Sequence, residues 1–465
     1  MNKTVKLLIC LIPFLLLLFD APQGLSVKAW QLFPFYIAAI LGIMFRPFPD
    51  AAVLLIFLGA YSVAFKGINV ALAGFGSATT WLVFGAFLIG NAFIETGLGR
   101  RIAYHLIDRF GRTTLGLGYA AAITDLAICP ATPSNTARTG GIVYPIFRSL
   151  SVALGSEPDN NPRKIGSYFA VAMYQISLCS GIIFMTGLAS NVLVHKYTVE
   201  VLKIDVTWAQ WFFYFCVPGL CCLALAPLVV YKLYPPELKI IDNKPIAKKG
   251  LEELGPMKKE EKLLLLFFVL AVIGWATGSY TKINATAVAL GFVALCLAFR
   301  VMSWESLSKD RSAWSTLMWY GGILSMATGL AKEGFFKWMG QYIQAHISFE
   351  GISPFVVLLG LLFISIIVRY LFASLAAYVA AILPVLYTLG LVGGVNPTLM
   401  FVVLAASSSF ASLLTHYGNA CGPVLYGTGY VPQGTWWKIG TVVMFVCIAV
   451  YTIIGLPYWK IIGLW

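Results

Sequence analysis

Long apolar runs separated by short polar turns make up nearly the whole chain. About eleven of these runs are long enough to cross a bilayer as a helix, which takes about 20 residues. They lie near residues 5–20, 28–45, 50–66, 78–97, 166–196, 210–232, 262–280, 284–300, 313–331, 398–425 and 437–458. The pattern predicts an all-α polytopic membrane protein.

Two further apolar regions, about 114–150 and 352–395, are interrupted near their midpoints by small or polar residues. The first contains Pro130 to Pro145, PATPSNTARTGGIVYP. Unpaired backbone groups cannot face lipid, so such a segment must be enclosed by protein or line a polar cavity. We therefore expect each region to be a re-entrant hairpin of two half-helices.

The two halves of the chain resemble each other. Each has an apolar span, a short amphipathic stretch, a hairpin, and then a span broken by polar residues: TGLASN at 186–191 and THYGNACGP at 415–423. An odd number of spans between equivalent points makes the copies inverted, an arrangement typical of secondary transporters. We expect an N-terminal membrane helix at 1–27, repeats at 28–233 and 262–465, and a cytoplasmic linker at 234–261.

Composition and charge support a membrane protein. Hydrophobic residues make up 59% of the chain and charged residues 11%, with a mean hydropathy of +0.84, against about 25% charged residues in soluble domains. The net charge of +13 arises largely from loops predicted on one side, including the linker. The positive-inside rule then places the N-terminus in the cytoplasm and the C-terminus outside. Because this rule accounts for the positive charge, we do not expect nucleic-acid binding.

The sequence predicts no metal or cofactor site. The nine cysteines form no CxxC pair, and the four histidines form no HExxH motif. We therefore interpret the cysteines as small, buried hydrophobic residues.

The hairpin tips are the candidate binding site. A half-helix N-terminus presents unpaired N–H groups and the positive end of its dipole, which attract anions. Two opposed tips can hold a molecule with an anionic group at each end. Ser134, Asn135 and Thr136 supply hydroxyl and amide groups on the first tip, and Ser374 supplies a hydroxyl on the second.

Four motifs carry a resemblance to a known family: PSNTAR at 133–138, LGPMKKEEK at 254–262, YLFAS at 370–374 and THYGNACGPVLYGTGYV at 415–431. Over nearly its whole length the chain resembles the divalent anion:sodium symporters, in the branch of the citrate/succinate and 2-oxoglutarate/malate exchangers. The resemblance implies a homodimer in which a fixed scaffold domain supports an elevator-type transport domain.

The resemblance also implies site residues. It places substrate carboxylates on Ser134, Asn135 and Thr136 and on Ser374. Sodium, in members that bind it, would lie near Asn135 and Gly187 in the first half, and near Leu375 and Gly418 in the second. We also count Gly187 and Gly418 among the expected substrate-binding residues.

Departures from the family pattern favour sodium-independent exchange. The second tip has Ser374-Leu375-Ala376 where sodium-coupled members repeat Ser-Asn-Thr, whereas Arg138 and His416 add a guanidinium and an imidazole near the two tips. These groups could replace two cations in neutralising a dianion, and we include both as substrate contacts.

Structural roles remain open for several of these residues. Arg138 could instead pair with Asp125, and a neutral His416 could bond a backbone carbonyl. Arg369 could brace the second hairpin. Asn191 and Asn419 could satisfy backbone at the span breaks or bind substrate.

The leading function is therefore a bacterial inner-membrane antiporter for di- or tricarboxylates such as succinate, malate, 2-oxoglutarate or citrate. Sodium-coupled symport is the alternative, and transport of sulfate, phosphate or arsenite is a third. A passive channel is disfavoured because opposed hairpins suggest an occluded site. An intramembrane enzyme using Ser134 and His416 lacks an orienting acid, so we expect no enzymatic activity.

Overall fold

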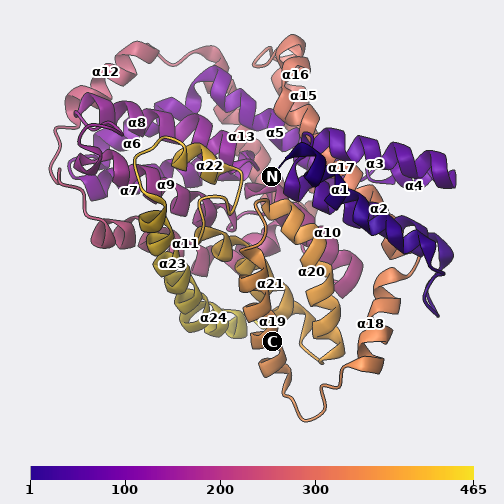
Figure 1. Cartoon of the computed structure of the whole chain (residues 1–465). Coiled ribbons are helices and arrows are strands. Elements are labelled where there is room, and N and C mark those ends of the chain that lie inside the picture. The colour runs from indigo at the N-terminus through magenta and orange to yellow at the C-terminus, as the bar shows by residue number, and fades with distance from the viewer. Residues whose placement is uncertain (1) are drawn as a thin grey trace.

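The fold, taken from a computed structural model that describes residues 2–465, is built from helices (Figure 1). Within that range, β-pairing consists of one isolated bridge between Thr113 and Ile240. By length and apolar composition, six of the described helices suffice to cross a membrane, and four shorter apolar helices accompany them. The predicted number of about eleven spans therefore stays a prediction.

The helices of the first half fall where the apolar runs lie. They are α1 (Lys3–Leu11), η1 (Ile12–Leu18), α2 (Val27–Phe45), α3 (Asp50–Phe65), α4 (Ile68–Ala73), α5 (Ala78–Thr96), α6 (Leu98–Phe110), α7 (Thr114–Ile128), η2 (Cys129–Ala131), η3 (Thr136–Val143), α8 (Tyr144–Ala153), η4 (Pro162–Lys164), α9 (Gly166–Gly181), η5 (Met185–Gly187), α10 (Ala189–Tyr197), η6 (Thr198–Leu202) and α11 (Trp208–Leu233).

The second half follows the same plan after the charged helix α12 (Lys244–Leu254). Its helices are α13 (Lys259–Ala276), α14 (Gly278–Thr281), α15 (Ala285–Ala298), α16 (Trp304–Lys309), α17 (Arg311–Lys332), α18 (Phe335–His346), α19 (Pro354–Arg369), α20 (Leu375–Val392), α21 (Pro397–Phe410), η7 (Ala411–Leu413), α22 (Cys421–Tyr426), α23 (Gln433–Val450), η8 (Tyr451–Gly455) and α24 (Leu456–Ile461).

The first predicted span, 5–20, is not one continuous α-helix. The α-helix ends at Leu11 and the chain continues as the tighter 3₁₀ turn η1, with Pro13 at its second position. Proline lacks the N–H that would continue the α-helical hydrogen bonds, which accounts for the change.

Both predicted hairpins are helix–turn–helix units. In the first, α7 and η2 lead to residues 132–135, and the chain returns through η3 and α8; in the second, α19 and α20 flank residues 370–374. The spans that follow are broken where expected, between α9 and α10 and between α21 and α22. Whether the hairpins re-enter the bilayer stays a prediction.

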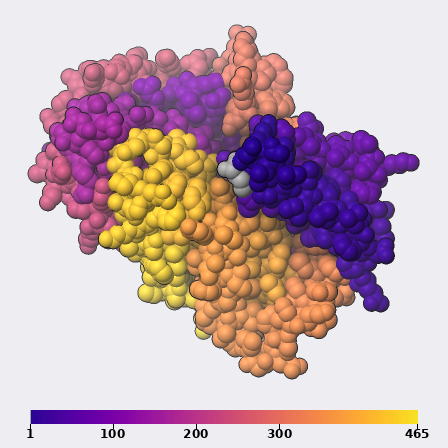
Figure 2. All heavy atoms as spheres, viewed as in Figure 1, coloured from indigo at the N-terminus to yellow at the C-terminus, as the bar shows by residue number. Residues whose placement is uncertain are grey.

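The helices pack as two groups that meet at the hairpin tips. In one, α17 contacts α2, α3, α4 and α5. In the other, α9 contacts α7, α11, α21, α22 and α23, so segments far apart in sequence share one core. Figure 2 shows the same relation on the surface, where the yellow C-terminal residues lie against the magenta residues of the first half.

Candidate functional site

A cavity of about 320 Å³ lies where the two helix groups meet, and both hairpin tips line it. It collects the residues predicted from the tips: Ser134, Asn135, Thr136 and Ser374. Its remaining lining residues are Arg46, Asp50, Phe87, Pro133, Leu188, Ala189, Ser190, Ser312, Thr316, Trp319, Leu375, Ala376, Asn419 and Ala420.

Each tip is the start of a helix. The Ser134 hydroxyl accepts a hydrogen bond from the Ala137 N–H at 3.2 Å, just before η3 begins. The Ser374 hydroxyl accepts from the Ala377 N–H at 3.3 Å and caps α20. Serine is a favoured N-cap because its oxygen satisfies one of the free N–H groups of the first turn. Two positive helix ends therefore line one cavity, which suits a molecule with two anionic groups.

The span breaks add two more helix starts to the same cavity. Leu188, Ala189 and Ser190 line it at the beginning of α10. Asn419 lines it just before α22, where its Oδ1 accepts from the N–H groups of Cys421 and Gly422 at 2.8 and 3.2 Å. Ser190 was not predicted as a site residue. Its position within TGLASN was the available signal, since a broken span presents polar groups at membrane depth.

Two amide groups in the cavity wall have free donors. The Nδ2 atoms of Asn135 and Asn419 are buried and have no hydrogen-bond partner among residues 2–465. A buried donor without a partner costs about 1–3 kcal/mol. Both donors are thus available to a bound acceptor. Asn191, by contrast, donates to the carbonyls of Gly181 and Phe184 and satisfies backbone at the break.

Arg138 does not line the cavity. Its guanidinium is fully buried and forms an ion pair with Asp125 at 3.0 Å. The other donors bond the carbonyls of Thr132 (2.7 Å), Gly187 (2.9 Å) and Ser177 (3.1 Å), and the Ser180 hydroxyl (3.4 Å). The geometry is that of the structural ion pair considered as the alternative, and the direct contact of Arg138 with substrate stays a prediction.

Arg138 instead joins the first tip to the first break, because it donates to Thr132 on one side and to Gly187 on the other. Arg369 does the same in the second half. It is buried and donates to the Phe372 carbonyl at 2.6 Å and to the Ser412 hydroxyl at 2.9 Å. The two arginines thus brace equivalent points of the two halves, although no carboxylate lies within 4.0 Å of Arg369 in the described part of the chain.

His416 also lies outside the cavity lining. Its Nδ1 accepts a hydrogen bond from the Trp437 indole at 3.0 Å, and its ring stacks on Tyr426 at 4.3 Å between centroids. Its Nδ1 therefore bonds an indole rather than the backbone carbonyl considered as the alternative, and the substrate contact expected from the sequence stays a prediction.

Gly187 and Gly418, predicted from the sequence, are not among the residues that line the cavity. A Cβ on Gly187 would lie 2.5 Å from the Gly181 carbonyl oxygen, and one on Gly418 would lie 2.2 Å from that of Ser412. Glycine at these positions permits close backbone packing at the two breaks.

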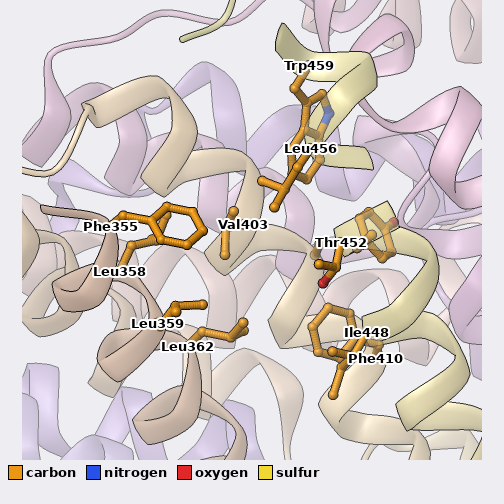
Figure 3. Close-up of a pocket in the computed structure, with 12 residues that line it drawn as sticks. Phe355, Leu358, Leu359, Leu362, Val403, Phe410, Ile448, Thr452, Leu456 and Trp459 are labelled. Atoms are coloured by element: carbon orange, nitrogen blue, oxygen red, sulfur yellow. The ribbon is translucent and has the colours of Figure 1, made fainter. Parts of the chain in front are cut away.

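A second cavity, of about 240 Å³, lies between α19, α21 and the C-terminal helices (Figure 3). Its walls are apolar side chains such as Phe355, Leu362 and Val403, with no charged residue among those that line it. An ionised carboxylate would lose its hydration there without a compensating partner. This apolar cavity therefore does not suit a carboxylate, and the cavity that both hairpin tips line is taken as the candidate substrate site.

Comparisons with known proteins agree with this architecture. Residues 1–465 match the family described as the sodium:sulfate symporter transmembrane region. The chain is 43% identical to the inner membrane protein YbhI of Escherichia coli, over 99% of this chain and 98% of that protein. It is 39% identical to the putative malate transporter YflS of Bacillus subtilis (100% and 97%) and 34% identical to the citrate/succinate antiporter of E. coli (96% and 95%).

The solved structure of the Alcanivorax borkumensis YdaH transporter shares the fold, with a TM-score of 0.58 at 11% identity over 94% of this chain and 99% of that one. The family match and the identities to its members establish what class of protein this is. The chain is a multi-pass membrane transporter of the divalent anion:sodium symporter family, and it is not an enzyme.

Proposed function

We propose that this protein is a secondary transporter that exchanges di- or tricarboxylates, of the succinate, malate, 2-oxoglutarate or citrate class, across the bacterial inner membrane without sodium. The observation that carries the proposal is the single cavity at which two hairpin tips and two span breaks present helix starts. Four helix starts on one cavity, with the free amide donors of Asn135 and Asn419, suit a multiply charged anion. The names of the malate and citrate/succinate relatives support the same substrate class.

Sodium independence is supported by the position of the Arg138 guanidinium, between the first hairpin tip and the first span break. Sodium in a protein is held by oxygen atoms, and the resemblance places one sodium between the first tip and the first break. In this chain the guanidinium already bonds the Thr132 and Gly187 carbonyls at that junction. A covalently attached cation then takes the place of a dissociable one. Arg138 acts in this proposal by holding the tip, and neither it nor His416 is retained as a substrate contact.

The elevator mechanism and the homodimer are part of the proposal. The cavity lies between the two helix groups, so a displacement of the tips and breaks relative to α2, α3, α5 and α17 would carry bound substrate across the membrane. The proposed orientation keeps the N-terminus in the cytoplasm and the C-terminus outside.

Uptake into proteoliposomes tests the proposal. Labelled succinate and 2-oxoglutarate are offered to vesicles that are empty or preloaded with unlabelled dicarboxylate, each in sodium and in choline buffer. We expect uptake into preloaded vesicles only, at equal rates in both buffers. Sodium-dependent uptake into empty vesicles would instead establish the alternative, sodium-coupled symport.

A further inference from the structure

An ion pair lines the wall of the substrate cavity that faces the hairpin tips. This wall is formed by the α2–α3 turn, which carries Arg46 and Asp50, and by the start of α17, with Ser312, Thr316 and Trp319. Arg46 ends α2 in the left-handed conformation (φ 50°), and its N–H donates to the Gly42 carbonyl at 2.9 Å. The side chain therefore projects from a fixed point of the helix group opposite the tips.

Arg46 keeps donors free for a ligand. Its Nε lies 3.6 Å from the nearest carboxylate oxygen of Asp50, and 50% of its side chain is exposed. Arg138, by comparison, is fully buried and uses its guanidinium on five acceptor groups. Among the residues that line the cavity, Arg46 is the basic one and Asp50 is the acidic one. A half-exposed guanidinium held loosely by one carboxylate can accept a second carboxylate on its planar fork.

The tips account for two carboxylates, one at each helix start. A tricarboxylate has a third, and an ionised carboxylate enclosed without a partner is costly. The wall opposite the tips carries the basic side chain of the cavity lining, Arg46. We propose that Arg46 binds this third carboxylate, so that the wall opposite the tips decides whether tricarboxylates are accepted. Asp50 holds the guanidinium in place and, by its own charge, limits the preference for the more highly charged substrate. This inference rests on the proposed function and adds a specificity determinant to it.

The two members of the pair have opposite expected effects. Arg46→Gln removes the positive partner and raises the KM for citrate about tenfold, the effect of losing one exposed charge-assisted hydrogen bond, while the KM for succinate stays nearly unchanged. Asp50→Asn removes the competing negative charge and lowers the KM for citrate. Arg46→Lys gives an intermediate KM for citrate, because lysine keeps the charge and loses the bidentate fork.

The experiment is counterflow into proteoliposomes preloaded with succinate, in an alkaline buffer in which all three carboxyl groups of citrate are ionised. Labelled citrate and labelled succinate are compared for the wild type and the three variants. Arg300→Gln is the control, since Arg300 also has positive φ (58°) just after a helix, one residue beyond the Phe299 C-cap of α15, and does not line the cavity. A wild-type size-exclusion profile and melting temperature of each purified variant show that it is folded, independently of transport.

A citrate-specific rise in KM for Arg46→Gln, with a fall for Asp50→Asn, supports the inference. Equal changes for both substrates, or shifts of the same sign in both variants, overturn it. It is also overturned if the wild type exchanges succinate but neither transports citrate nor is inhibited by it, an outcome that leaves the proposed function standing. Failure of the wild type to exchange any of these carboxylates would instead refute the proposed function.

Discussion

We predict that the buried ion pair between Asp125 and Arg138 is essential to the stability of the protein. Both side chains are fully buried, and their Nε–Oδ2 distance is 3.0 Å. Asp125 also accepts from the Thr139 hydroxyl at 2.5 Å and from Ser180. The change Asp125→Asn preserves the volume of the side chain and leaves the guanidinium enclosed without a countercharge. Removing one partner of a buried pair costs about 3–5 kcal/mol, and we expect a loss of that size.

A second pair in the same molecule is the matched control. Lys244 and Asp108 lie at the same 3.0 Å, but their side chains are 61% and 42% exposed. Exposed pairs contribute at most about 1 kcal/mol, so Asp108→Asn should have little effect. The assay is reversible denaturation of the purified protein in mixed micelles, with the free energy of unfolding compared among the wild type and both variants. Equal losses for Asp125→Asn and Asp108→Asn would refute the reasoning that burial makes the Asp125–Arg138 pair essential.

Three further predictions follow from individual contacts. Asn135→Ala should raise the KM for succinate about tenfold with no loss of thermal stability, because its Nδ2 has no hydrogen-bond partner among residues 2–465. Asn191→Ala removes two hydrogen bonds to backbone. It should lower the melting temperature and leave the KM for succinate nearly unchanged in the same assays. Gly187→Ala places a methyl group 2.5 Å from the Gly181 carbonyl oxygen and 2.8 Å from the Cys129 sulfur. The free energy of unfolding should fall by about 1–3 kcal/mol. An unchanged melting temperature would show that the neighbouring backbone moves to accept the methyl group. The hydrogen bond from His195 lowers the pKa of Asp205, which lies in the loop before α11. The pair therefore stabilises the fold above the ordinary pKa of an aspartate, and this contribution disappears as pH falls through the lowered value. Since 83% of the Asp205 side chain is exposed, Asp205→Asn should cost less than about 1 kcal/mol at neutral pH and reduce the acid dependence of unfolding.

Hydrophobic patterning was sufficient to place most of the helices and the two interrupted regions along the chain. The interrupted regions 114–150 and 352–395 correspond to the two helix–turn–helix units, and the charged segment 234–261 contains α12. These features follow from local sequence, because a bilayer requires long apolar stretches and excludes unpaired backbone. The same rule located Ser134, Asn135, Thr136 and Ser374, which share one cavity in the structure.

The partners of the polar side chains were decided only by the tertiary structure. Arg138 contacts Asp125 thirteen positions away and Gly187 in a different span, and His416 contacts Trp437. From sequence, each of these groups had both a substrate role and a structural role open to it. The convergence of Ser190, Asn419 and Arg46 on the tips likewise requires the packing of separate helices. Apolar periodicity specifies where a helix lies in the chain, but the partner of a buried charge depends on which neighbouring helix presents an acceptor at the right depth, and that depends on the packing of the whole protein.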